Sequence, residues 1–386
     1  MINTRTMTQK NPKTQAAKIA LGIAVGAALA VGAGVGIYGV LHLSRPKPAN
    51  VSMVDPATLA RPAPVVGERI GQFRPDFDHA RCIAVSPADE LYITGDMAIR
   101  RFDAAGGPLS EIETTEPPEA VAVDANGNIY ATFGDKIWVF DASGNRSAAW
   151  DARDGALFTS IAAANGEVFA ADAAGRCVIR YDKTGKVLGV IGKRDTSRDI
   201  RGLLVPSPYF DVTTSPDGLV RVTNPGRHTV EGYTLDGDRK SAWGFFSAVK
   251  PGGFVGCCNP ANFAVIPAAG DESGAFAGFV TAEKGVAKVK VFDAKGKFAG
   301  LLAPADTYKR HDELISAKPT GRPFRALDLA AGAAGQIYVL DGAIGEVHIY
   351  EWRKKNDGVP APTESQQAPD AANTEVREEQ QEAVSP

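Results

Sequence analysis

The sequence is poor in the residues and motifs on which most enzymes depend. Its 386 residues include only 4 cysteines and 5 histidines. It has no GxSxG, HExxH or Walker motif, and no GxGxxG placed between a strand and a helix, so the common hydrolase, metalloprotease and nucleotide-binding signatures are absent. It also lacks the CxxC pairs that make a zinc site predictable. No standard catalytic template is indicated, and whether the protein is an enzyme stays open.

An excess of charge of one sign is also missing. Acidic and basic residues nearly balance, with a net charge of −3. No dense stripe of Lys and Arg with interleaved aromatics is present, and such a stripe is the usual footprint of a nucleic-acid-binding surface. Nucleic acid is therefore not an expected partner.

One long segment carries no formal charge, Ile19–Leu43. As a helix rising ~1.5 Å per residue, it exceeds the ~30 Å hydrocarbon core of a bilayer. Before it lie four cations and no acid: Arg5, Lys10, Lys13 and Lys18. This excess predicts a single-pass membrane protein with a cytoplasmic N-terminus and a periplasmic or cell-surface remainder. The alternative is a signal peptide cleaved near Ala28-Leu29-Ala30, which would also export the rest of the chain.

Composition divides the remaining chain into a linker, a folded region and a tail. Residues 1–18 form a basic cytoplasmic N-terminus before the anchor at 19–43, and residues 44–64 are rich in proline, which is typical of a semi-rigid spacer. Residues 354–386 are polar, acidic and free of aromatics, which predicts a disordered tail. The folded region is therefore expected to span residues 65–353.

An internal repeat organises this folded region. Each copy has a short apolar strand, a Gly/Asp/Asn turn, a strand such as IYVL, a second turn and a strand ending near Asp and Gly. Most copies are followed by a fourth strand. The six copies begin at Ile83, Val121, Ile161, Phe210, Phe263 and Leu327. This pattern predicts an all-β, six-bladed propeller of four-stranded blades, preceded by one transmembrane helix.

The last copy ends at its third strand, near Glu351-Trp352. The stretch Val65–Phe73 precedes the first copy and belongs to no blade of its own. We expect it to supply the missing outer strand and close the ring, since closure protects the sheet edges that an open array exposes.

The repeat pattern I-A-V-D-x-x-G-x-I-Y, followed by x-V-x-V-F-D-x-x-G, resembles the NHL-repeat β-propellers over about three quarters of the chain. The run GFVGCCNP with downstream VTAEKGVAKVKVFDAKGKF also resembles a subgroup of bacterial NHL-like proteins. The resemblance implies a propeller fold. It implies no particular activity, because such propellers include both binding modules and enzymes.

Blade topology predicts which loops share a face of the ring. The loop before each first strand and the loop between strands two and three lie on one side. Those loops concentrate the chemically distinctive residues, whereas the loops of the opposite side are plain turns. The candidate binding face comprises His79, Arg81, Cys82, Cys177, His228, Cys257, Cys258, Asn259, Glu283, Lys284 and Arg325.

Two acids stand out in the innermost strands. When the copies are aligned on their apolar residues, Asp211 and Asp328 occupy a position filled elsewhere by Ala84, Ala122, Ala162 and Ala264. A carboxylate near the axis must be solvated, paired or bound to a cation. We expect hydrogen bonds from neighbouring strands or an ion pair with Arg325. The alternative is a metal ion in the central channel, held by Asp211, Asp328 or His228.

The adjacent cysteines Cys257 and Cys258 lie in a Gly- and Pro-bounded loop before an inner strand. We predict that both lie on the surface at the mouth of the channel. A disulfide between them is one expectation, although neighbouring Cα atoms ~3.8 Å apart are closer than the usual ~4.4–6.8 Å and would strain the ring. A bond from one of them to Cys82 or Cys177, free thiols and a soft-metal site are the alternatives.

These observations support two functions. The first is a membrane-anchored, extracytoplasmic binding or scaffold module that receives an exported protein or small ligand on the Cys-bearing face. The alternative is a metal-dependent or redox-active enzyme with its site at the channel mouth. His42, His311 and His348 have no evident partners in the sequence and are assigned no role.

Overall fold

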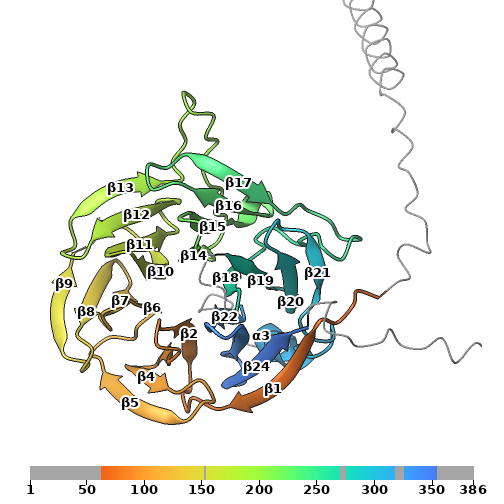
Figure 1. The fold of residues 1–386 in the computed structure, drawn as a ribbon, viewed down its shortest axis with the longest axis horizontal. Coiled ribbons are helices and arrows are strands. Elements are labelled where there is room, and N and C mark those ends of the chain that lie inside the picture. Colours follow the sequence, from red (N-terminus) through yellow and green to blue (C-terminus); the bar gives the residue numbers. More distant parts are fainter. Residues whose placement is uncertain (1–61, 152–153, 270–274, 318–325, 354–386) are drawn as a thin grey trace, which may run out of the picture. The chain divides into compact units, whose positions relative to one another are not determined.

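The chain folds into a ring of β-sheets. The computed structural model describes residues 62–151, 154–269, 275–317 and 326–353. Within these ranges there are six four-stranded antiparallel sheets, arranged as blades around a common axis (Figure 1). The predicted six-bladed propeller of four-stranded blades is therefore confirmed.

The first five blades run outward from the axis in chain order, and the sixth takes its outermost strand from the start of the folded region. The first three blades are β2–β5 (Ala80–Val85, Leu91–Gly95, Ala98–Phe102, Pro108–Glu113), β6–β9 (Ala120–Val123, Ile129–Phe133, Lys136–Phe140, Arg146–Trp150) and β10–β13 (Phe158–Ala164, Glu167–Asp172, Cys177–Asp182, Val187–Ile191). The next two are β14–β17 (Val212–Thr214, Val220–Asn224, Thr229–Tyr233, Arg239–Trp243) and β18–β21 (Asn262–Pro267, Phe276–Glu283, Lys288–Asp293, Phe298–Leu301). The sixth is β22–β24 (Asp328–Ala331, Gln336–Asp341, Glu346–Trp352) with β1 (Gly67–Phe73).

Strand β1 closes the ring as predicted. It pairs antiparallel with β24, from Gly67 opposite Trp352 to Phe73 opposite Val347. The backbone N–H of Arg353 also donates to the Val66 carbonyl at 2.8 Å. The first and last blade strands in sequence thus share one sheet, and the otherwise open edge of β24 is covered.

In the first, second, third and fifth blades, the turn between the third and fourth strands is built by an aspartate and a glycine, and in the fourth blade Thr234 replaces the aspartate. In the second blade, Asp141 Oδ1 accepts the N–H groups of Ser143 and Asn145 at 2.9 Å. Gly144 follows with φ of +86°, a conformation that costs glycine little and other residues much. The Asp-x-x-Gly signature in the sequence therefore places these reversals directly.

The hydrophobic core lies between neighbouring blades. Second and third strands are almost wholly buried, whereas an outer strand such as β5 exposes most of its side chains. Trp150 shows the packing across a blade boundary, with its ring centroid 5.6 Å from that of Tyr130 and 5.7 Å from that of Tyr181. Each blade needs the next to bury its face, so an isolated blade would not be stable.

Three long excursions interrupt the repeat, in chain order residues 192–211, 244–261 and 302–327. A helix, α3 (Lys309–Ala317), lies between β21 and β22 and buries His311. The segment from residue 244 to residue 261 joins β17 to β18 and buries Phe254 in an aromatic cluster with Trp243 and Phe292. The second excursion carries the adjacent cysteines, so Phe254 anchors that loop to the fifth blade.

The predicted anchor, linker and tail (1–18, 19–43, 44–64 and 354–386) lie almost wholly outside the described residues. Within the described part of the chain, no helix is both long and apolar enough to cross a membrane. The membrane anchor at 19–43 stays a prediction.

Candidate functional site

A cavity of about 640 Å³ runs along the axis of the ring. The six inner strands, β2, β6, β10, β14, β18 and β22, surround the axis in Figure 1. Residues of all six line the cavity. Small and apolar side chains make up much of that wall, such as those of Ala84, Ala162 and Leu329. Polar side chains also line the cavity, and the two inner-strand acids are among them.

The pairing register corrects the sequence alignment of those acids. Asp211 lies opposite Thr223. Its backbone N–H donates to Thr223 Oγ1 at 2.9 Å, and its backbone carbonyl accepts the Thr223 N–H at 3.0 Å. Cys82 opposes Thr94 in the same way, and Ala120 opposes Thr132. Asp211 is therefore equivalent to Cys82 and Ala120, two residues before the predicted position at Ala84 and Ala122.

The same correction applies to Asp328. Ala330 opposes Tyr338, as Ala84 opposes Tyr92. Asp328 thus also stands two residues before the alanine position, at the level of Cys82. One ring of the cavity wall combines both acids with three other side chains: Cys82, Ser160 and Phe263. A slip of two residues leaves the side-chain alternation unchanged, and hence it was invisible in the apolar pattern.

Asp211 links three consecutive blades. Its Oδ1 accepts hydrogen bonds from the Ser160 hydroxyl at 2.5 Å and from the backbone N–H of the next residue, Val212, at 2.9 Å. Its Oδ2 accepts the N–H of Phe263 at 2.8 Å. These donors come from β10, β14 and β18, so the carboxyl group ties inner strands that have no ladder hydrogen bonds to one another.

Asp328 forms the corresponding link between the last and first blades. Its Oδ2 accepts the N–H of Ile83 at 2.8 Å, and the Cys82 thiol also donates to its carboxylate. The expectation that the acids accept hydrogen bonds from neighbouring strands is confirmed. The proposed pairing partner, Arg325, lies outside the described residues.

Burial makes both carboxyl groups harder to ionise. It raises the pKa of Asp211 to about 7, and the negative charge of Asp328 adds to the shift. It raises the pKa of Asp328 to about 6. The Cys82 thiol has a pKa raised well above its ordinary value, first by burial and then by the charge of Asp328. The cavity therefore holds acids that exchange protons near neutral pH.

These shifts predict that stability falls as pH rises from 5 to 8. A carboxyl whose folded pKa exceeds its unfolded value binds more protons in the folded state between the two values, so raising the pH through that window favours unfolding. We expect a loss of about 1–3 kcal/mol in the free energy of unfolding, since one pKa unit corresponds to about 1.4 kcal/mol. Asp211→Asn should flatten this dependence.

Urea unfolding of the wild type and Asp211→Asn at both pH values checks the expectation. Asp141→Asn is the matched control, because hydrogen bonds from Asn145 lower the pKa of Asp141 and it stays ionised throughout this range. Equal pH slopes for the wild type and Asp211→Asn would show that Asp211 does not titrate in this window.

No metal site is formed by the predicted ligands. Asp211 and Asp328 line the cavity, whereas His228 is not among the lining residues. Nε2 of His228 instead contacts the Gly256 carbonyl at 2.5 Å. Among residues 62–151, 154–269, 275–317 and 326–353, no group of three or more His, Cys, Asp or Glu side chains is placed to hold a metal ion.

The adjacent cysteines occupy different environments. Cys257 is exposed, whereas Cys258 is only 3% exposed, which corrects the prediction that both lie on the surface. Ser207 and Lys284, from other segments of the chain, interact with the Cys258 side chain and contribute to its burial. The Sγ atoms are 3.1 Å apart and unbonded, and none of the four cysteines, all within the described residues, forms a disulfide.

Cys258 lies in a setting that stabilises a thiolate. Burial raises the pKa of Cys258, but the Ser207 hydroxyl, the Cys257 thiol and the Lys284 ammonium together outweigh it and lower the pKa below the ordinary value. The hydrogen bond to Cys258 correspondingly raises the pKa of Cys257. These directions correspond to a Cys257 thiol that donates to the Cys258 sulfur.

The side chain of Asn259 holds the cysteine loop in place. Its Nδ2 donates to the Val255 carbonyl at 2.6 Å and to the Lys284 carbonyl at 3.1 Å, and its Oδ1 accepts the Lys284 N–H at 2.9 Å. The peptide bond between Asn259 and Pro260 is cis. Asn259 is buried rather than available on the binding face, and its role is to fix the loop.

Lys284 connects the cysteine loop to the cavity. Its Nζ lies 4.5 Å from the centroid of the Tyr209 ring, and Tyr209 lines the cavity wall. Neither cysteine of the pair is itself a lining residue. The pair thus lies beside the cavity, and Lys284 lies between it and the wall residue Tyr209.

Several other members of the predicted face are differently placed. Cys177 is fully buried between the second and third blades, and Glu283 is 2% exposed in an ion pair with Lys290. Both are corrections, because each side chain points from its strand into the packed interior. His79 is exposed and contacts Asp96 at 3.1 Å, while Arg81 lines the cavity and pairs with Glu119.

The cysteine loop also exposes apolar side chains in the stretch before the two cysteines. Four of them, all from residues 245–255, are substantially exposed: Phe245 47%, Phe246 60%, Val249 48% and Val255 39%. Grouped exposed apolar residues are typical of interaction surfaces. No repeat pattern pointed to them, since the excursion that carries them lies outside the blades.

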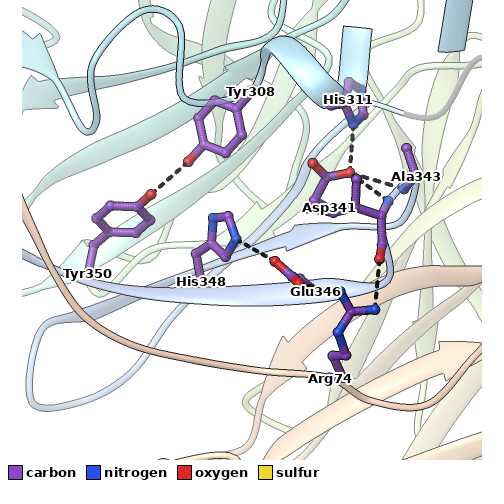
Figure 2. A network of polar contacts seen from close by, with 9 residues as sticks. Arg74, Tyr308, His311, Asp341, Ala343, Glu346, His348 and Tyr350 are labelled. Carbon is purple, nitrogen blue, oxygen red and sulfur yellow. Dashed lines mark hydrogen bonds and ion pairs between the residues drawn. The ribbon is translucent and has the colours of Figure 1, made fainter. Parts of the chain in front are cut away.

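Two histidines without evident partners in the sequence belong to a polar network around the sixth blade (Figure 2). His311 of α3 meets Asp341 Oδ1 at 2.8 Å, with both side chains buried. His348 Nε2 meets Glu346 Oε2 at 3.2 Å, and Glu346 also pairs with Arg74 at 2.5 Å. The earlier assignment of no partner is wrong for both: Asp341 meets His311 from a separate segment, and Glu346 lies two residues before His348 on the same strand.

Comparisons with known proteins identify the fold and no family. No family model matches the chain, and no curated protein matches its sequence. A Bacteroides thetaiotaomicron protein of unknown function has a similar structure, with 13% identity, coverage of 75% of this chain and 76% of that one, and a TM-score of 0.50. The NHL resemblance stays a prediction.

Two lyase structures are also similar in fold. Virginiamycin B lyase from Staphylococcus aureus has 16% identity and a TM-score of 0.46, covering 75% of this chain and 90% of that one. A streptogramin B lyase has 13% identity and a TM-score of 0.47, covering 75% of this chain and 88% of that one. At such identities the likeness extends to the propeller alone.

Proposed function

We propose that this protein is a membrane-anchored, extracytoplasmic binding propeller that takes a small ligand into its central cavity beside the Cys-bearing loop. The uncharged segment Ile19–Leu43 and the cations before it support the anchor and its orientation. The resemblance to NHL propellers supports a repeat scaffold that presents a binding face. Protease digestion of intact cells tests the orientation, since an exported propeller would be degraded before lysis.

The cavity is the observation that carries the binding role. Its volume of about 640 Å³ lies within the ~300–1,000 Å³ range of small-molecule sites. Its wall combines apolar side chains with polar ones, and the polar groups of Asp211, Asp328 and Ser160 stand at one level of the wall. Such a combination binds a ligand's apolar body and orients it through a small number of polar contacts.

A substitution that fills the cavity should abolish ligand binding. Thr213 lines the wall and is partly exposed to it, so Thr213→Phe would occupy the volume a ligand needs. We expect compounds from a drug-sized panel that raise the melting temperature of the full-length protein to bind this variant at least about tenfold more weakly, a change of about 1.4 kcal/mol.

Thr184→Phe is the matched control. Thr184 lies in the exposed turn between β12 and β13, away from the cavity wall, and the same chemical change there should leave binding intact. Stabilising compounds that bind all three proteins equally would place their site elsewhere and would refute the cavity as the ligand site.

A further inference from the structure

The cysteine loop supports a second activity that does not depend on the cavity ligand. We propose that Cys257 and Cys258 form a thiol–disulfide exchange site for small-molecule disulfides, in which Cys257 attacks the substrate and Cys258 resolves the mixed disulfide. The proposal rests on the placement of the two sulfurs, on the groups that converge on Cys258 and on the rigidity of the loop.

The two sulfurs are placed for sequential attack. They lie 3.1 Å apart, on the same side of the chain although the residues are adjacent. Cys257 is exposed and can be reached by a substrate, whereas Cys258 is 3% exposed and can be reached mainly through Cys257. The exposure of the two sulfurs thus sets the order of the steps. The Cys257 sulfur reacts first with the substrate, and the Cys258 sulfur then attacks it and releases the bound thiolate.

Three groups converge on the sulfur of Cys258. The Ser207 oxygen is buried, has no conventional hydrogen-bond partner and lies against this sulfur. The Lys284 ammonium supplies a positive charge, and the Cys257 thiol donates to the same sulfur. These groups favour the thiolate of Cys258, which is the form that attacks a mixed disulfide.

The loop is held rigidly from both sides of the pair. Asn259 bonds to Val255 before the cysteines and to Lys284 across from them, and Lys290 Nζ donates to the Gly253 carbonyl at 2.5 Å. Sulfurs held close by backbone contacts lose little conformational entropy when they react. The other cysteines lack this setting, since Cys177 is fully buried and Cys82 faces an acid.

The exchange balances in atoms and electrons. Starting from the dithiol, Cys258 first releases its proton to solvent and becomes a thiolate. Cys257 then attacks one sulfur of a disulfide RSSR, passes its proton to the Cys258 thiolate and releases the first thiolate. Cys258 then loses that proton to solvent, attacks the Cys257 sulfur and releases the second thiolate. Both thiolates take protons from solvent, so the dithiol gives up two electrons and two protons while RSSR becomes two RSH. Because adjacent cysteines form a strained ring, the reverse reaction is expected to be readily accessible.

Mass spectrometry of the reduced full-length protein after addition of glutathione disulfide tests this sequence of steps. The wild type should lose the mass of two hydrogen atoms, with a transient glutathione adduct. Cys258→Ser should stop at a stable adduct on Cys257, because no resolving thiol remains. Cys257→Ser should react at least about tenfold more slowly, since the remaining sulfur is buried. Lys284→Met should prolong the adduct by weakening the resolving thiolate.

Cys177→Ala is the control and should follow the wild-type course, and thermal unfolding of each variant confirms that it is folded. Two results would overturn the proposal: Cys257→Ser reacting as fast as the wild type, or the wild type ending as a stable glutathione adduct. Both outcomes are independent of the cavity-filling test, so failure here would leave the ligand-binding role unaffected.

Discussion

A chain that begins at Arg74 should fail to form a stable propeller, whereas one that begins at Ala63 should fold. The shorter chain lacks β1, and β24 then becomes an open edge with unpaired N–H and C=O groups. The sixth blade also loses its outer cover, including the packing of Phe73 against Phe102, whose ring centroids are 5.1 Å apart. We expect a loss of about 5 kcal/mol or more, comparable with the whole stability of many domains.

Thermal unfolding and gel filtration of the two chains measure this effect. The shorter chain should aggregate or melt well below the longer one. Adding a peptide of residues 63–73 should restore the cooperative transition, because the strand is held by pairing rather than by chain continuity. A shorter chain that melts within a few degrees of the longer one would show that β1 contributes little to closure.

Replacing Lys290 by Met should destabilise the protein by about 3–5 kcal/mol, the usual cost of leaving a buried charge without its partner. Lys290 Nζ lies 2.6 Å from Glu283 Oε1, with the two side chains 4% and 2% exposed. Burial lowers the pKa of Lys290 and raises that of Glu283, while each charge opposes the shift of the other. The variant would leave the Glu283 carboxylate buried and unpaired.

The double variant Glu283→Gln/Lys290→Met should recover most of this loss, since it removes both charges together. Arg310→Met is a surface control. Arg310 and Glu313 form an exposed pair at 3.3 Å, for which a change below about 1 kcal/mol is expected. Urea unfolding of the four proteins measures these differences. A Lys290→Met variant as stable as Arg310→Met would contradict a stabilising role for the buried pair.

Lys290 also links stability to the cysteine loop. Its second hydrogen bond goes to the Gly253 carbonyl, four residues before Cys257. The buried ion pair thus supports the segment that presents the two sulfurs. Its position explains why this loop, although outside the repeat, has a defined conformation.

The repeat period made the fold accessible from the sequence. Blade number, strand number and closure by residues 65–73 follow from local signals: Asp-x-x-Gly turns, apolar strands and an incomplete last copy. Each of these depends on residues close together in the chain, or on a copy that can be compared with the others. The excursions have no copy for comparison, so α3 and the exposed aromatics of residues 245–255 were not predicted.

The chemistry of the candidate sites depends on contacts between residues that cannot be read from the sequence. The alternation of side chains cannot detect a two-residue slip, so only the pairing of Asp211 with Thr223 identified the correct level of the cavity wall. His311 and Asp341 are thirty residues apart, and their contact requires α3 to fold against the sixth blade.

The sequence by itself determined a closed six-bladed ring and the loop that carries Cys257 and Cys258. Only the tertiary structure decided that one sulfur is exposed and the other buried. Burial depends on what packs above a side chain, and for Cys258 those neighbours, Ser207 and Lys284, come from the segment before β14 and the turn after β19. Local sequence patterns show how the side chains of a strand alternate between its two faces. Which side chains meet across blades is decided by the closure of the ring.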